Sequence, residues 1–189
     1  KELLARLDAI DTTGFPEQER LNKALVARAA REDIESAKFK EWEMPANQFY
    51  GPHHAFVSLA TDSPFDSTKD YENYIARLHK VARAFDQVTA NMRQGMRDKL
   101  MPPKYLLEKV AAQAQQVADA PLDKSTFTEP LRKLPDSISP EDRRRLEASI
   151  EEAVKNEIAP AYVKFAKFVR EEYAPHGRLD PGVWALPDG

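Results

Sequence analysis

The sequence contains no cysteine among its 189 residues. This absence excludes a disulfide scaffold, the cysteine-ligated zinc folds and a thiol nucleophile. Glycine is scarce as well, with six residues and no Gly-x-Gly, so a glycine-rich loop that cradles phosphate is missing. No apolar run approaches the roughly 20 residues that cross a bilayer as a helix. We therefore expect no transmembrane segment.

Neither sign of charge dominates the chain. Lys and Arg total 28 and Asp and Glu total 31, which gives a formal net charge of −3. The two signs are interspersed, and this argues against a surface that wraps nucleic acid. Apolar residues make up 42% of the chain and recur periodically, so the chain should fold around a core. We expect residues 1–189 to form a single helical domain.

Apolar residues recur at three- and four-residue intervals, which predicts an all-α protein, an irregular multi-helix array without significant sheet. The strongest stripe in the first half comprises Tyr71, Tyr74, Ile75, Leu78, Val81, Phe85, Val88, Met92 and Met96. A second stripe comprises Leu146, Ile150, Val154, Ile158, Tyr162, Phe165 and Val169. Long helices are predicted near residues 16–40, 68–98, 103–119 and 139–173. The last should kink at Pro160, whose ring clashes with the carbonyl of Asn156.

Local signals support the starts of two of these helices. Ser67 and Asp70 have the spacing of a capping box, and Ser139 is an N-cap residue followed by Pro140 at the first helical position. A short helix from Pro52 to about Ala60 is predicted between two proline-containing loops. Residues 121–138 are rich in proline, so we expect an extended internal connector with at most one helical turn. Its apolar side chains should lie against the core: Leu122, Phe127, Leu131 and Leu134.

The four histidines do not form a metal-binding pattern. Helical zinc sites often place two histidines four residues apart around a glutamate, and no pair here has that spacing. His53 and His54 are adjacent, so their side chains diverge, and loop or cap roles are favoured over a ligand role. His79 lies near Arg83, whose charge disfavours a metal, and His176 is typical of a helix end. We therefore assign no metal ligand.

Other catalytic patterns are missing too. The sequence has no Gly-x-Ser-x-Gly nucleophile elbow. The acidic pairs at 151–152 and 171–172 are typical of solvated helix faces, and the charges of Arg143, Arg144 and Arg145 are largely cancelled by neighbouring acids. Tyrosine and phenylalanine clusters at helical spacing are typical of a core rather than a ligand pocket. The residues by themselves predict no catalytic and no cofactor-binding residue.

Several short phrases follow one another in order along the chain: Asp70-Tyr-Glu-Asn-Tyr-Ile-Ala-Arg-Leu78, Asn91-Met-Arg-Gln-Gly95, Met101-Pro102-Pro103, Ile158-Ala-Pro-Ala-Tyr162, Glu172-Tyr-Ala-Pro175, Arg178, Gly182 and Leu186-Pro-Asp-Gly189. The set resembles the N-terminal part of the bacterial domain-of-unknown-function 885 family over roughly residues 15–189. The positions that carry this resemblance, which we call the landmark residues, have no assigned role: Asp70, Tyr71, Gly95, Pro160, Tyr162, Tyr173, Arg178 and Gly182.

The resemblance implies an all-helical protein much longer than this chain. Family members look like distant relatives of zinc metallopeptidases of the helical carboxypeptidase type, and many carry secretion or lipoprotein signals. Their metal site is a His-Glu…Pro-Gly-His segment located downstream, which this chain lacks, so no ligand or catalytic glutamate is carried over. The resemblance thus implies zinc only in a full-length parent. It implies a periplasmic or outer-membrane lipoprotein of a bacterium, with a cytoplasmic location left open.

Three landmark positions suggest structural roles. Gly95 would let another helix approach the 68–98 helix closely. A kink at Pro160 would let the last long helix curve around a cleft. Residues 173–189 would be a turn-rich lead into the remaining polypeptide.

Two functions of different classes remain open. In the first, the chain is the non-catalytic N-terminal helical portion of a secreted or lipoprotein metallopeptidase-like hydrolase and forms part of the substrate-cleft wall. Its partner is then the C-terminal part of the same protein, and the parent acts on peptides. In the second, it is a stand-alone protein-binding module with a groove between residues 71–96 and 139–173. The chain begins at Lys1 without an initiating Met, so we expect a fragment, which could dimerise through exposed apolar surface.

Overall fold

The regular elements of the computed structural model, which describes residues 1–187, are all helical. The all-α fold predicted from the apolar periodicity is therefore confirmed. The described chain divides into two compact units, Lys1–Glu41 and a second unit that begins at Trp42. This division is finer than the single domain expected from the sequence, and each unit is described separately below.

The first unit is a helical hairpin of α1 (Glu2–Asp8) and α2 (Glu17–Ser36), followed by a 3-10 turn, η1 (Ala37–Phe39). The Lys23 ammonium group donates to the carbonyl of Ile10 at 2.6 Å and so ties the loop to α2. The α-helix predicted near residues 16–40 ends earlier, at Ser36, because the chain tightens into η1 and Lys40 then turns left-handed, with φ 51°.

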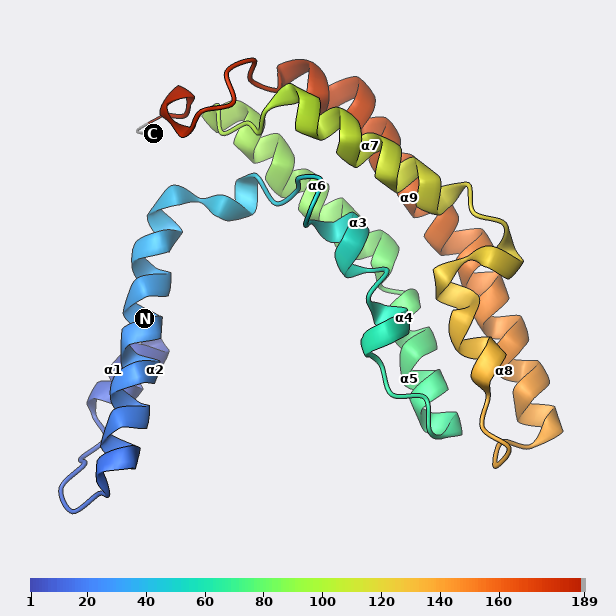
Figure 1. Ribbon diagram of the computed structural model, residues 1–189, viewed down its shortest axis with the longest axis horizontal. Helices are drawn as coiled ribbons and strands as arrows, with labels where there is room; N and C mark the ends of the chain where they lie inside the picture. The colour runs from blue at the N-terminus through green and yellow to red at the C-terminus, as the bar shows by residue number, and fades with distance from the viewer. Residues whose placement is uncertain (188–189) are drawn as a thin grey trace. The chain divides into compact units, whose positions relative to one another are not determined.

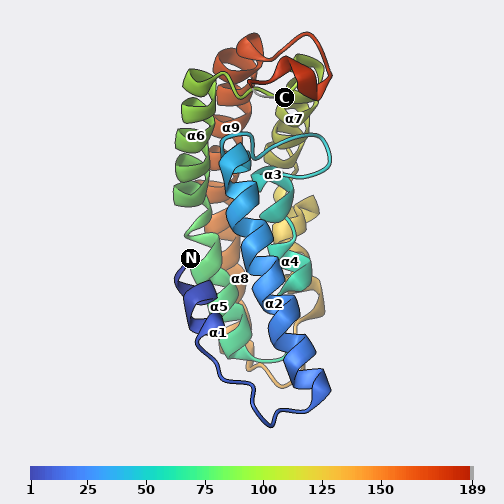
Figure 2. The same ribbon diagram turned by 90° about the vertical axis from the view of Figure 1, so that its left-hand side faces the viewer.

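The second unit is built from three long helical rods that lie side by side (Figures 1 and 2). The middle rod packs against both of the others, and the rod containing α7 runs opposite to the other two. The first rod consists of α5 (Thr68–Leu78) and α6 (Val81–Asp98), and a second rod consists of α7 (Lys104–Ala118). The middle rod consists of α8 (Pro140–Ala153), the π-helical turn η5 (Val154–Ile158), α9 (Ala159–Lys167) and the π-helical turn η6 (Phe168–Tyr173).

The helix predicted over residues 68–98 is interrupted between α5 and α6. At the break, the Lys80 amide bonds to the carbonyl of Arg77, a tighter i to i−3 turn, and the α-helix resumes at Val81. The Nδ1 atom of His79 lies 2.7 Å from Oε1 of Glu157, which belongs to the π-helical turn η5 of the neighbouring rod. Both rods therefore change their winding at the same level. Pro160 follows η5 on the middle rod, whereas no proline or glycine marks the break between α5 and α6.

The helix around Pro160 continues, as predicted, instead of stopping. Just before the proline the chain forms η5, in which the Ala159 amide bonds to the carbonyl of Val154, five residues back. A π-helical turn is wider than an α-helical turn. The wider turn accommodates a residue that has no N–H and whose ring would clash with the preceding turn.

The segments between the rods are mostly short helices. The single helix predicted from Pro52 to about Ala60 is two helices, α3 (Pro52–Ala55) and α4 (Leu59–Asp62). The predicted connector at 121–138 is more helical than expected, since it contains two 3-10 segments, η3 (Leu122–Lys124) and η4 (Thr126–Lys133). The remaining 3-10 turns are η2 (Glu41–Glu43), η7 (Ala174–His176) and η8 (Val183–Ala185).

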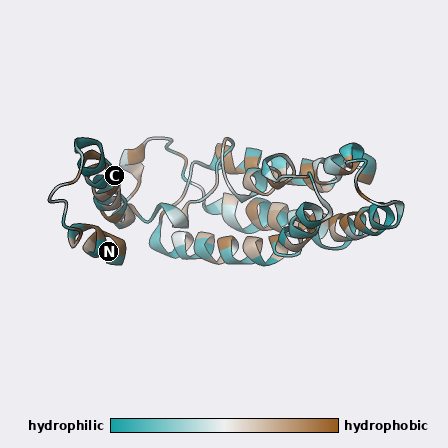
Figure 3. Ribbon diagram, turned by 90° about the horizontal axis from the view of Figure 1, so that it is seen from below, coloured by the Kyte–Doolittle hydropathy of each residue, from teal (hydrophilic) through white to brown (hydrophobic). Residues whose placement is uncertain are grey.

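Apolar faces of all three rods meet in one core. Each rod carries both hydrophobic and hydrophilic residues along its length (Figure 3). The predicted stripes supply its centre, where the ring of Phe85 lies 4.9 Å from that of Tyr162 and 4.7 Å from that of Phe165. Phe127 of the connector is buried, and Leu122, Leu131 and Leu134 pack against this core, as predicted.

Gly95 permits a close approach, and the approaching segment is the short 3-10 helix η2. A Cβ atom at this position would lie 2.5 Å from the carbonyl oxygen of Glu43 and 3.0 Å from that of Leu100. Backbone atoms cannot swing away as a flexible side chain can. The expected close approach is therefore present, but the approaching element is the short 3-10 helix η2 and not one of the long helices.

We predict that Gly95→Ala destabilises the chain. Helix propensity alone would make the substitution stabilising by about 0.5–1 kcal/mol. The clash with the Glu43 carbonyl should outweigh this gain and lower the urea midpoint. Asn91→Ala, at an exposed position one turn earlier on α6, is the matched control and should not lower the midpoint. A Gly95→Ala chain that is as stable as wild type or more so would contradict the close approach.

Candidate functional site

Buried tyrosines on the long helices bind backbone carbonyls of the irregular segments. From α5, the Tyr71 hydroxyl donates to the carbonyl of Pro130 and the Tyr74 hydroxyl donates to that of Phe127, each at 2.9 Å. Both carbonyls belong to η4. Since a buried carbonyl without a partner is costly, these two bonds fix the connector on the core.

Two further tyrosines do the same for the segment that opens the second unit. The Tyr162 hydroxyl of α9 donates to the carbonyl of His53 at 2.9 Å, and the Tyr173 hydroxyl of η6 donates to that of Glu43 at 3.5 Å. Burial raises the pKa of both phenols, so they remain protonated donors at neutral pH. The landmark residues Tyr71, Tyr162 and Tyr173 therefore act as structural donors in the described chain.

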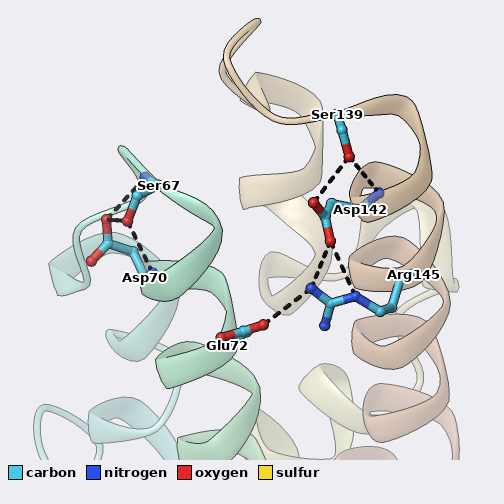
Figure 4. A network of polar contacts seen from close by, with 6 residues as sticks. All are labelled: Ser67, Asp70, Glu72, Ser139, Asp142 and Arg145. Carbon is cyan, nitrogen blue, oxygen red and sulfur yellow. Dashed lines mark hydrogen bonds and ion pairs between the residues drawn. The ribbon is translucent and has the colours of Figure 1, made fainter.

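The landmark residue Asp70 caps its own helix. Its carboxylate accepts from the Ser67 amide at 3.0 Å, while the Ser67 hydroxyl accepts from the Asp70 amide, which completes the predicted capping box. Figure 4 shows this box at the start of α5. All these contacts lie at the start of α5, so the carboxylate of Asp70 stabilises the N-terminal end of this helix.

A similar N-cap begins α8, and Arg145 connects this helix start to α5 (Figure 4). The Ser139 hydroxyl accepts from the Asp142 amide at 3.1 Å, which confirms the predicted N-cap. Arg145 donates to Oδ1 of Asp142 at 2.8 Å and to Oε1 of Glu72 at 3.0 Å. Hydrogen bonds from Arg145 and then Ser139 lower the pKa of the Asp142 carboxyl. Arg145 thus links the starts of two parallel rods instead of presenting a free cation.

Four polar pairs join these two rods along their length: the ion pairs Glu72–Arg145, Asp86–Lys164 and Arg93–Glu172, and the hydrogen-bonded pair His79–Glu157. We call this set the ladder. On the first rod the members 72, 79, 86 and 93 lie seven residues apart, with His79 at the break between α5 and α6. On the middle rod 157 and 164 keep this interval, whereas 145 and 157 are twelve residues apart. The last interval, from 164 to 172, is eight, because it contains the π-helical turn η6 with its extra residue.

The strongest member of the ladder is the pair of Arg93 and Glu172. The guanidinium donates to both carboxylate oxygens, at 2.6 and 2.7 Å, and lies 4.8 Å above the ring of Phe168. The hydrogen bond from Arg93 lowers the pKa of the Glu172 carboxyl. Exposed pairs of this kind contribute about 0–1 kcal/mol each, so the ladder mainly fixes the register of the rods.

A shallow pocket of about 260 Å³ opens between α6 and α9 beside the landmark residue Pro160. It lies where the sequence suggested a partner groove, between residues 71–96 and 139–173. Elsewhere along this seam, aromatic packing and the ladder bring the rods into contact. The pocket is lined by Ala82, Phe85, Asp86, Asn156, Glu157, Pro160, Ala161 and Lys164.

The most unusual polar group is His53, which is only 1% exposed. Its Nε2 atom lies 3.2 Å from Oε1 of Gln113 on α7, so Nε2 carries the hydrogen and Nδ1 is the bare nitrogen. Among the described atoms, Nδ1 has no hydrogen-bond partner. Gln113 in turn donates to the backbone carbonyl of Gln48 at 3.1 Å, and Nε2 of His54 lies 3.3 Å from the same carbonyl.

Sequence reasoning missed this cluster. His53 faces inward because α3 packs on α7, and its ring stacks 6.2 Å from that of Phe165 on α9. Burial, with a smaller repulsion from His54, lowers the pKa of His53 to about 4, although the bond to Gln113 opposes the shift. The adjacent histidines in the sequence gave no sign of which one would be buried.

The last two landmark residues build a turn near the C-terminal end of the described chain. The Arg178 guanidinium donates to the carbonyls of Met101 at 2.9 Å and Asp180 at 2.7 Å, and also to the carbonyl of Gly182. The Gly182 amide donates to the carboxylate of Asp180 at 2.9 Å. The last phrase of the sequence pattern lies partly outside the described residues, which end at residue 187.

Residues 1–187 contain no group of three or more His, Asp or Glu side chains placed to hold a metal ion. The rings of His53 and His54 lie 4.2 Å apart, while His176 lies at the end of η7, as predicted. The described residues therefore do not fit a zinc site. None of the helices in this part of the chain is both long and apolar enough to span a bilayer.

The burial of neutral His53 predicts that acid destabilises the fold. In the unfolded chain the imidazole binds a proton near pH 6.5, whereas in the folded chain it does so only near pH 4. The free energy of unfolding should thus be unaffected by His53 above pH 6.5 and fall by about 3 kcal/mol as the pH drops from 6.5 to 4. Urea unfolding measured from pH 7.5 to 4 tests this.

A variant pair isolates His53 from other acid effects. His53→Gln removes the titrating ring and should flatten the fall in stability between pH 6.5 and 4. His176→Gln, at an exposed position, is the control and should keep the wild-type slope. If His53→Gln and wild type lose stability in parallel, the buried neutral imidazole is not the cause.

Loss of one tyrosine hydroxyl should leave a buried carbonyl without its donor. We expect Tyr162→Phe to cost about 1–3 kcal/mol of unfolding free energy, since the His53 carbonyl would then be unpaired. Tyr105→Phe removes a hydroxyl from a tyrosine that is half exposed and should change stability little. Equal urea midpoints for Tyr162→Phe and wild type would refute this role of the hydroxyl.

Comparisons with known proteins complete the description of this chain. A search of curated proteins finds no match. Among solved structures, the chain is similar to the crystal structure of "the putative lipoprotein from Colwellia psychrerythraea", with a TM-score of 0.68 and 22% identity. The similarity covers 75% of this chain but 25% of that one, so this chain corresponds to about a quarter of the solved protein's length. The model of the family described as "Bacterial protein of unknown function (DUF885)" matches residues 1–189, and the chain belongs to this family.

Proposed function

We propose that the chain is the non-catalytic helical portion of a longer metallopeptidase-like hydrolase, in which it forms part of the wall of the substrate cleft. One observation carries this proposal: the polar atoms of the landmark residues are used to hold the fold. The hydroxyls of Tyr71, Tyr162 and Tyr173 bind backbone carbonyls, and the carboxylate of Asp70 caps a helix. Side chains engaged in this way support a scaffold.

The proposal places the chemistry on other parts of the polypeptide. The described residues do not fit a zinc site, so the metal of a peptidase would be held by residues elsewhere in the parent. The partner of this chain is then the remainder of the same protein, and peptide is the substrate of the whole. The length of the solved structure, of which this chain covers 25%, is consistent with such a parent.

The solved structure of similar fold also supports a proposal for the cellular location of the parent protein. The solved protein of similar fold is described as a lipoprotein of a bacterium. We propose that the parent of this chain is likewise secreted or lipid-anchored, in the periplasm or at the outer membrane. A leader or lipidated cysteine would lie on the parent polypeptide, because the present sequence contains no cysteine.

The alternative is a stand-alone protein-binding module. The pocket beside Pro160 favours it, because it opens between the two rods and carries both apolar and charged side chains. The reading frame discriminates between the proposals. A frame that continues well past Gly189 and encodes His-Glu supports the hydrolase, whereas a stop codon at Gly189 supports the module.

The scaffold proposal predicts an inert isolated chain. Purified residues 1–189 should bind no stoichiometric zinc by metal analysis after dialysis, and should cleave no peptide from a mixed peptide library. The longer polypeptide from the same frame should do both, because the ligands and the cleft are then complete. One equivalent of tightly bound zinc in the isolated chain, with peptide turnover, would overturn the proposal.

A further inference from the structure

The turn at residues 178–184 exposes three large apolar side chains. Leu179 is 86% exposed, Val183 is 62% exposed and Trp184 is 72% exposed. Exposed apolar residues are common singly, but three within six positions of a single turn form a local patch. We call these residues the Trp184 turn.

The turn is anchored firmly to the rest of its unit. The Lys104 amide donates to the Arg178 carbonyl at 2.9 Å, and the Arg178 amide donates to the Pro102 carbonyl at 3.2 Å. The Arg178 side chain adds a bond to the Met101 carbonyl at 2.9 Å. The backbone that carries the apolar side chains is thus tied to the loop before α7 and is not a free tail.

The orientation of Trp184 is also fixed. Its indole N–H donates to the Asp180 carboxylate at 2.9 Å, and its ring lies directly over Gly182. A Cβ atom at position 182 would approach the indole ring to 2.1 Å, so only glycine leaves room for this orientation. The other Asp180 oxygen accepts from the Gly182 amide at 2.9 Å.

The polar atoms of the turn are thereby used within the turn. Hydrogen bonds from the Gly182 amide and the Trp184 indole, with a smaller contribution from the charge of Arg178, lower the pKa of the Asp180 carboxyl. The Arg178 guanidinium itself binds backbone carbonyls. The surface that the turn leaves available to a partner is therefore apolar. An apolar, preorganised surface with tryptophan at its centre is typical of permanent interfaces, where ordering costs little on binding.

We infer that the Trp184 turn is the docking surface for the remainder of the same polypeptide, with the indole seated in an apolar pocket of that part. This inference rests on the proposed function, which supplies the partner. The solved protein of similar fold, of which this chain covers 25%, provides ample further chain to cover the patch. The landmark residues Arg178 and Gly182 then have a definite role, which is to position Trp184 for this contact.

Tryptophan quenching tests the inference directly. Trp42→Phe leaves Trp184 as the only tryptophan of the present 189 residues, and any tryptophan elsewhere in the longer polypeptide is replaced by phenylalanine. In the isolated chain, acrylamide should quench Trp184 readily, as expected for an exposed indole. In the longer polypeptide, quenching should fall several-fold and the emission should shift to the blue.

Gly182→Ala provides a matched variant that keeps the tryptophan but displaces its ring. In the longer polypeptide it should restore much of the quenching and lower the urea midpoint. In the isolated chain it should change the quenching little, because the indole is exposed before and after the substitution. Trp184→Ala should likewise destabilise the longer polypeptide and leave the isolated chain nearly unchanged.

Two outcomes would overturn the inference. Equal quenching of Trp184 in the isolated chain and in the longer polypeptide would show that nothing covers the turn. Sedimentation showing an isolated-chain dimer that Trp184→Ala dissociates would assign the turn to a second copy instead. A longer polypeptide that shields Trp184 without cleaving peptide would refute the proposed hydrolase and keep the docking surface, so the two failures are distinguishable.

Discussion

The fold depends on buried tyrosine hydroxyls that bind carbonyls of the 3-10 segments and of the single-turn helix α3. A short irregular segment exposes backbone carbonyls that helices satisfy internally, and burying them without a donor is costly. Tyr71 and Tyr74 supply donors to η4, and Tyr162 supplies one to α3. Each tyrosine also contributes its ring to the core, so one residue type satisfies the packing and the hydrogen bonding together.

The two parallel rods illustrate how local irregularities preserve a long-range register. The break between α5 and α6 lies opposite η5, and η6 adds the residue that lets Arg93 reach Glu172. The ion pairs are weak individually, but they occur only when both rods keep this register. Pro160 fits into the same scheme, because the π-helical turn before it removes the conflict with the preceding carbonyl.

The family resemblance and the structure together give the landmark residues a common interpretation. They hold the fold through caps, hydroxyl bonds and close backbone approaches. The C-terminal turn differs from the others, since its polar groups are satisfied internally while Trp184 faces outward.

The sequence by itself determined the all-α class, the buried faces of the long helices and the starts of α5 and α8. Apolar stripes at helical spacing identify the buried faces, and Ser67 and Ser139 mark helix starts through contacts within one turn. It could not determine that His53 is buried, that Glu43 approaches Gly95, or where the helix over 68–98 breaks. Those features arise from atoms far apart in the chain that meet only after packing, and local pattern carries no information about such contacts. Tertiary structure decided them.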